Sequence, residues 1–249
     1  MSHRLLSCLG AALCLLAGLS PIFAQTDAVP VAAPVPALVP SREFVIVSGG
    51  PALRTFERDK RASHDKYWGN FIDAALLRFK QLQSQLQPGE KITWLVYRPG
   101  YRQRGAEMVA DLLDEVMARA NKADVNLLWF DRAPQVVNYL NRGKDRKTTP
   151  VVVFEYFGHS NKACFLFDYS NDIDGMSVDY LHVRDLSDIS QNALASDATS
   201  KSWGCHSGEL FSASWKKRFG TPMEGAIGKT DYSRGGLPFL SSEGGRWNQ

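Results

Sequence analysis

Residues 149–160 read TPVVVFEYFGHS, and this stretch carries the strongest strand signal in the chain. Apolar and aromatic side chains fill almost every position between Pro150 and Gly158, without alternation of polar and apolar residues. A continuous apolar run of this kind predicts a strand covered on both faces, as in a parallel sheet flanked by helices. The run ends in Gly-His-Ser, so a histidine, His159, directly follows the strand.

The segments around this strand alternate between strand and helix patterns. Strands are predicted at 43–50, 91–100 and 125–131, and helices at 70–86, 105–121, 133–143 and 208–220. Residues 163–171 predict a second short strand, in a hairpin with the strand at 149–160. Residues 172–200 predict a polar surface excursion. Residues 225–233 (GAIGKTDYS) predict a strand that returns toward the same edge. This order predicts an α/β fold, a three-layer α/β/α sandwich with a mostly parallel central sheet.

The N-terminal region differs in composition from the rest. A basic start, an apolar run and a small residue at Ala24 predict a signal peptide over 1–24, hence a secreted or periplasmic protein with no membrane attachment after cleavage. An uncleaved anchor is the alternative. Residues 25–41 contain four prolines and predict an extended linker. Residues 42–249 are expected to form a single domain, with a core at 91–230 and an added strand and helix at 42–88.

Charge and cysteine content narrow the function classes. The net charge is +3, with basic residues scattered among acids, which argues against a nucleic-acid surface. Removal of the leader leaves Cys164 and Cys205, too few for a disulfide framework in a domain of this size. An exported compartment nevertheless permits one disulfide between these two cysteines.

The stretch SWGCHSG, residues 202–208, supplies a candidate nucleophile. Catalytic groups of open α/β sheets lie beyond the carboxyl ends of strands, so Cys205 and His159 are expected at neighbouring strand ends. A thiol needs a base to become a thiolate, and histidine titrates near neutral pH. A helix beginning near Gly208 would place its dipole behind the thiolate. Backbone N–H groups at Gly158, Ser160 and Gly204 are the candidate oxyanion donors.

Two other interpretations use the same residues. Two thiols and two imidazoles, those of His159, Cys164, Cys205 and His206, suit zinc, although adjacent side chains on extended backbone diverge. A disulfide between the two cysteines would abolish the nucleophile. His206 either tunes the site or caps the following turn; the cap is the favoured expectation, and His159 is the expected base.

Taken together, the segments VVVFEYFGHS and SWGCHSG, with the strands and helices before them, resemble the caspase-like cysteine peptidases, which include caspases, metacaspases, legumain and gingipain. The resemblance covers about residues 91–230. It implies a nucleophilic Cys205 and a general acid–base His159 that cleave peptide bonds of a peptide or protein substrate, with no metal or organic cofactor. Asp231 and Asp168 are candidates for a pocket that receives a basic side chain. The alternative is a catalytically silent domain that binds a peptide or protein. It is favoured by the polar residues of the segment directly before Cys205.

Overall fold

The computed structural model describes residues 41–52, 66–168 and 179–248. The signal peptide expected at 1–24 and all but the last residue of the linker expected at 25–41 lie outside them. The described residues belong to one compact unit. Within these three ranges no helix combines the length and apolarity needed to cross a bilayer.

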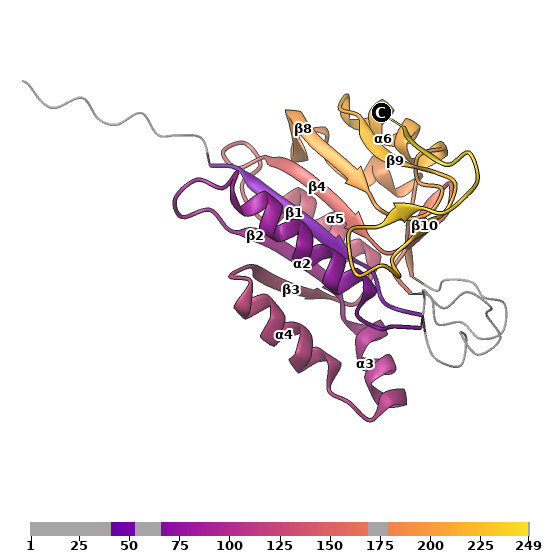
Figure 1. The fold of residues 1–249 in the computed structure, drawn as a ribbon. Helices are drawn as coiled ribbons and strands as arrows, with labels where there is room; N and C mark the ends of the chain where they lie inside the picture. Colours follow the sequence, from indigo (N-terminus) through magenta and orange to yellow (C-terminus); the bar gives the residue numbers. More distant parts are fainter. Residues whose placement is uncertain (1–40, 53–65, 169–178, 249) are drawn as a thin grey trace, which may run out of the picture. The chain divides into compact units, whose positions relative to one another are not determined.

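A seven-stranded sheet forms the centre of the described part, in the order β12-β9-β8-β4-β1-β2-β3 (Figure 1). Neighbouring strands are parallel except for β12, which runs antiparallel to β9 at one edge. The strands are β1 (Glu43–Ser48), β2 (Ile92–Tyr97), β3 (Asn126–Phe130), β4 (Val151–Phe157), β8 (Leu194–Ser202), β9 (Met223–Ile227) and β12 (Arg246–Asn248). The predicted mostly parallel sheet is therefore confirmed.

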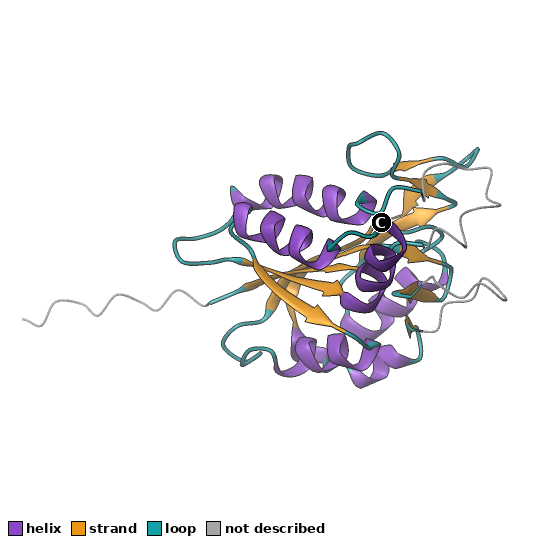
Figure 2. Cartoon of the chain, turned by 90° about the horizontal axis from the view of Figure 1, so that it is seen from below, coloured by secondary structure: helices purple, strands orange, loops and turns teal. Residues whose placement is uncertain are grey.

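Helices cover both faces of this sheet, as Figure 2 shows. Alternate residues of each strand point to opposite faces, so two separate apolar clusters form. One face packs against α2 (Asn70–Gln83), α3 (Arg98–Met108) and α4 (Leu112–Lys122). The other packs against α5 (Ala133–Arg142) and α6 (Leu210–Phe219). These layers confirm the predicted three-layer α/β/α sandwich.

The first strand lies in the interior of the sheet. β1 pairs with β2 on one side and with β4 on the other, and its residues are all buried. Residues 42–88, expected to be an addition to the core, thus supply one of its interior strands. The strand order reverses direction between β1 and β4, and ligands of open α/β sheets bind beyond the carboxyl ends at such a switch point. His159 follows β4 at this place.

The single helix expected at 105–121 is two helices. Pro99 and Gly100, expected to end a strand, instead lie in the first turn of α3, where the missing N–H of proline has no consequence. Val109 ends α3 in the left-handed region at φ 54° and is 95% exposed, not part of an apolar face. The side chain of Asp111 then caps α4 by accepting from the N–H groups of Leu113 and Asp114, both at 3.1 Å.

The polar segment before Cys205 is a regular strand. β8 has buried residues at alternating positions in its last part, Ala198, Ser200 and Ser202, while Thr199 between them is exposed. Lys201 lies 3.8 Å from the ring of Trp203 and pairs with Glu224 at 2.9 Å. One side of this strand is therefore open to solvent, which explains its polarity and corrects the expectation of a surface excursion over its residues.

Two small sheets follow the main strands. β5 (His159–Ser160), β6 (Cys164–Leu166) and β7 (Tyr180–His182) form one, and β10 (Thr230–Asp231) with β11 (Phe239–Leu240) forms the other. The antiparallel pairing of β5 and β6 confirms the expected hairpin. Residues 169–178, which hold the end of the strand expected at 163–171 and the start of the expected excursion, lie outside the described residues.

Candidate active site

The loops that carry His159 and Cys205 are in direct contact. They follow β4 and β8, which are adjacent and parallel, so both loops leave the same edge of the sheet. Ser160 Oγ donates to the carbonyl oxygen of Cys205 at 2.6 Å. Trp203 N donates to Tyr156 O at 2.9 Å just before the loops begin. The pairing of strand ends expected from the sequence is therefore present.

Gly204 lies at the closest approach of the two loops. A Cβ atom at this position would lie 2.2 Å from Ser160 Oγ and 2.9 Å from Gly158 O. Both distances are shorter than any van der Waals contact, so only glycine fits here without movement of one loop. The residue before Cys205 is therefore fitted to the loop that carries His159.

The His159 side chain is half-buried and rests on an aromatic residue. Its ring makes an edge-to-face contact with Phe71, at the start of α2, with centroids 4.9 Å apart. The carbonyl oxygen of His159 accepts from the hydroxyl of Tyr156 at 2.7 Å. Backbone and ring are both held, which restricts the directions in which the imidazole can point.

The turn after Cys205 is fastened to the strand that follows α6. His206 N donates to Gly228 O at 2.7 Å, and Gly208 N donates to Ala226 O at 2.9 Å. Thr230 N donates to Cys205 Sγ at 3.3 Å, so the half-buried thiol is held at the end of this row of bonds. This contact confirms that residues 225–233 return to the site.

The C-terminal strand secures the far end of the same turn. Asn248 Nδ2 donates to Gly208 O at 2.6 Å, and Asn248 Oδ1 accepts from Gly225 N at 2.8 Å. A single amide of β12 thus links the turn after Cys205 to β9.

The helix expected directly behind Cys205 begins later. α6 starts at Leu210, and the turn Cys205–Glu209 separates it from the thiol. Because the influence of a helix dipole falls off within the first turn, the helix does not act on Cys205 in the way the sequence suggested. The helix begins two residues later than expected because the N–H groups of His206 and Gly208 bond to Gly228 O and Ala226 O.

His206 turns to an acid rather than to the thiol. Its Nδ1 lies 2.8 Å from Glu209 Oε1, and Lys162 Nζ lies 2.6 Å from the other oxygen of that carboxylate. The bond from Lys162, followed by that from His206, holds the pKa of Glu209 below its usual value. His206 thus closes the turn, in agreement with the role expected for it, and leaves His159 as the candidate partner of Cys205.

Two of the candidate oxyanion donors have weak internal partners. Gly158 N donates to the hydroxyl of Tyr232 at 3.4 Å, and Gly204 N donates to Ser202 Oγ at 3.3 Å. Both distances exceed the usual range for N–H···O bonds. Ser160, the third candidate, lies in the β5–β6 hairpin.

The two candidate pocket acids lie in different places. Asp231 is half-buried in β10, next to Thr230, which contacts the Cys205 sulfur. Asp168 is buried and donates its N–H to Asp179 O at 3.0 Å. Burial and then the charge of Asp168 raise the pKa of Tyr97, which ends β2. The structure therefore places Asp231 beside the residue that contacts the thiol, and groups Asp168 with Tyr97 and Asp179.

Cys164 neither forms a disulfide with Cys205 nor has a readily ionised thiol. Both residues are free thiols, so the alternative of a disulfide between them is not realised. Burial, followed by the charge of Asp185, raises the pKa of Cys164 to about 11. Over the described ranges, no group of three or more histidine, cysteine or acidic side chains is arranged to hold a metal ion.

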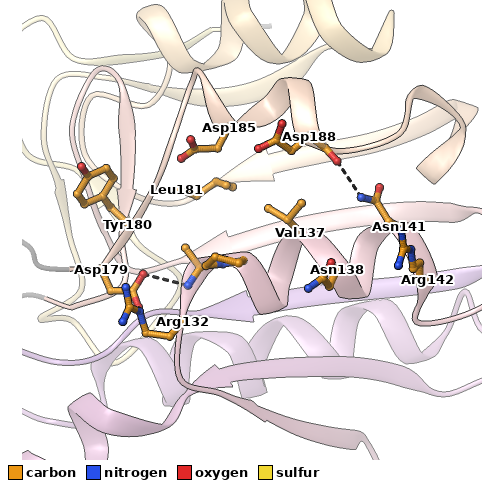
Figure 3. Close-up of a pocket in the computed structure, with 12 residues that line it drawn as sticks. Arg132, Val137, Asn138, Asn141, Arg142, Asp179, Tyr180, Leu181, Asp185 and Asp188 are labelled. Atoms are coloured by element: carbon orange, nitrogen blue, oxygen red, sulfur yellow. Dashed lines mark hydrogen bonds and ion pairs between the residues drawn. The ribbon is translucent and has the colours of Figure 1, made fainter.

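Cavities lie near the site and away from it. One of about 330 Å³ is lined by the start of α2 and the segment after β10, including Asp73 and Tyr232. A larger one of about 550 Å³ lies between α5 and residues 179–188 (Figure 3). Asp179 caps α5 there by accepting from Ala133 N at 2.9 Å, and the described lining of this cavity includes neither Cys205 nor His159.

Three residues of the site were not identified from the sequence. Phe71 supports the imidazole, Thr230 contacts the thiol, and Tyr232 bonds to both loops. None of these residue types marks a catalytic site by itself, and none of the three residues lies within either motif. The sequence pointed toward Thr230 and Tyr232 only through the predicted return of residues 225–233 to the edge of the sheet.

Comparisons with known proteins returned no match. No family model, no curated protein and no solved structure matches this chain.

Proposed function

We propose that this protein is an exported cysteine endopeptidase of the caspase-like type, in which Cys205 is the nucleophile and His159 the general acid–base. The observation that carries the proposal is the contact between the two loops, in which Ser160 Oγ bonds to Cys205 O at 2.6 Å. It joins the loop that carries a half-buried thiol to the loop that carries a half-buried imidazole, at the carboxyl edge of the mostly parallel sheet.

The proposed reaction uses only groups of this chain. His159 takes the proton of the Cys205 thiol, and the thiolate attacks the carbonyl carbon of the scissile peptide bond. The N–H group of Gly204, released from its weak bond to Ser202 Oγ, bonds to the developing oxyanion. His159 then returns the proton to the leaving amine, and water hydrolyses the thioester that remains.

A second candidate function is peptide binding without cleavage. The Gly158 and Gly204 N–H groups have internal acceptors, Tyr232 and Ser202, which a substrate oxyanion would have to displace. If these bonds persist when a peptide binds, the fold retains a peptide site without efficient catalysis.

Alkylation of the two cysteines tests the dyad. At about pH 7, iodoacetamide is expected to modify Cys205 and to spare Cys164, whose buried thiol has a pKa raised to about 11. His159→Ala is expected to slow the modification of Cys205 about tenfold or more, because the thiol loses its base. Peptide mass spectrometry measures both sites in one sample, and His206→Ala is the matched control, since His206 bonds to Glu209.

The dyad would be contradicted if His159→Ala left the rate of Cys205 alkylation unchanged, or if His206→Ala changed that rate by the same factor. A peptide-library assay of capture and cleavage distinguishes peptide binding from peptidase activity. It compares the unaltered protein with the Cys205→Ala variant. Capture of peptides by both proteins with cleavage by neither would favour the silent domain.

A further inference from the structure

A single buried tyrosine bonds to both halves of the candidate site. Tyr232 follows β10 directly and is 8% exposed. Its hydroxyl donates to Trp203 O at 3.1 Å and accepts from Gly158 N at 3.4 Å. Trp203 lies two residues before Cys205, and Gly158 lies immediately before His159. The hydroxyl therefore spans the gap between the two loops at the point where each leaves its strand.

The ring of Tyr232 reaches the same histidine by a second route. It makes an edge-to-face contact with Phe71, with centroids 4.9 Å apart, and Phe71 makes the same kind of contact with His159. A shift of the tyrosine would therefore alter the support of the imidazole as well as the bond to Gly158.

Thr230, two residues earlier, fastens the thiol side of this arrangement. Its hydroxyl donates to Trp203 O at 2.9 Å, and its N–H donates to Cys205 Sγ at 3.3 Å. The carbonyl of Trp203 thus accepts from two hydroxyls of one short segment. That segment contacts the nucleophile, the loop before it and the loop before the histidine.

We propose that Tyr232 is a positioning residue, which holds His159 in the place from which its ring can reach Cys205. The inference rests on the proposed dyad. Beyond the ends of β4 and β8 the sheet no longer fixes the spacing of the two loops, and the hydroxyl of Tyr232 replaces the missing ladder contacts. Burial raises the pKa of Tyr232 well above its usual value, so the hydroxyl keeps its proton at neutral pH.

Tyr232→Phe tests the inference, because it removes the hydroxyl and keeps the ring against Phe71. We expect the rate at which iodoacetamide modifies Cys205 at about pH 7 to fall about tenfold, since small displacements of catalytic groups have large effects on rate. The matched control is Tyr139→Phe, which removes a hydroxyl bond to Glu43 of 2.6 Å at the opposite end of the strands. That variant should leave the Cys205 rate unchanged.

A double variant separates positioning from a general loss of structure. If Tyr232 acts through His159, Tyr232→Phe causes no further decrease once His159→Ala is present. Two results would overturn the inference while leaving the dyad in place. One is that Tyr232→Phe lowers the rate of Cys205 alkylation equally with His159 present and with His159→Ala. The other is that Tyr232→Phe and Tyr139→Phe give the same rate of Cys205 alkylation. A Cys205 rate that does not respond to His159→Ala would instead overturn the dyad, and the positioning role with it.

Discussion

Gly204 shows how one residue can make a site possible without taking part in its chemistry. The absence of a side chain lets the backbone before Cys205 lie against Ser160 and Gly158. The neighbouring polar contacts depend on this approach, including the bond from Ser160 Oγ to Cys205 O. The amino acid at position 204 is thus determined by a residue more than 40 positions away along the chain.

Gly204→Ala is expected to lower the free energy of unfolding by about 1–3 kcal/mol, because the new Cβ overlaps Ser160 Oγ. It should also slow alkylation of Cys205, since one loop must move. Chemical denaturation and the alkylation rate measure the two effects. Combination with Ser160→Gly should recover part of the stability, and Gly236→Ala is the control because nothing lies within 4 Å of its Cβ position. Equal losses for Gly204→Ala and Gly236→Ala would contradict the close approach.

Among the elements, α3 and α4 show a boundary that periodicity alone does not reveal. Apolar residues continue at helical spacing across the break, so the segment reads as one helix. The break arises because Asp111 offers its carboxylate to two N–H groups of α4, while Val109 turns the chain out of α3. An N-cap of this kind is a local signal, and aspartate is a favoured residue for it.

Asp111→Ala is expected to lower the free energy of unfolding by about 1 kcal/mol, since two N–H groups lose their acceptor. Asp111→Asn should retain most of the stability, because asparagine caps equally well. Urea denaturation followed by circular dichroism compares the three proteins. Identical midpoints for the alanine and asparagine variants would show that the side-chain cap does not stabilise α4.

At the scale of the whole molecule, the two ends of the central sheet carry different groups of residues. The carboxyl end carries the loops of the candidate site, and the amino end carries a buried ionic cluster around Glu43. Glu43 is fully buried and bonds to Arg146, Tyr139 and Thr93. Burial alone would raise the pKa of Glu43, but the bonds from Tyr139, Arg146 and Thr93 outweigh it and lower the pKa. We infer that this cluster stabilises the fold at a distance from the site.

Glu43→Gln is expected to lower the free energy of unfolding by about 3–5 kcal/mol, because Arg146 is left buried without its charge partner. Since the pKa of Glu43 is lowered on folding, its contribution is present above the usual carboxyl pKa and is lost as the pH falls through the lowered value. The variant should therefore lose less stability on acidification than the unaltered protein. Denaturation series across acidic pH measure this difference.

The exposed pair of Glu115 and Arg119 provides the comparison, since Glu115→Gln should change stability by no more than about 1 kcal/mol. The alkylation rate of Cys205 at about pH 7 should be the same in both variants. An equally steep loss of stability in acid for Glu43→Gln and the unaltered protein would contradict the role of the cluster.

The sequence by itself determined the class of fold and the two residues at its candidate centre. Apolar runs and helical periodicity reflect local burial, so they predicted the α/β order and placed His159 and Cys205 after strands. Only the tertiary structure decided the interior position of β1, the open side of β8, and the contacts of Thr230 and Tyr232 with the two loops. These features depend on which strands pair and which faces of the sheet the helices cover. Both involve segments far apart in the sequence, so the residue pattern of one segment does not predict them.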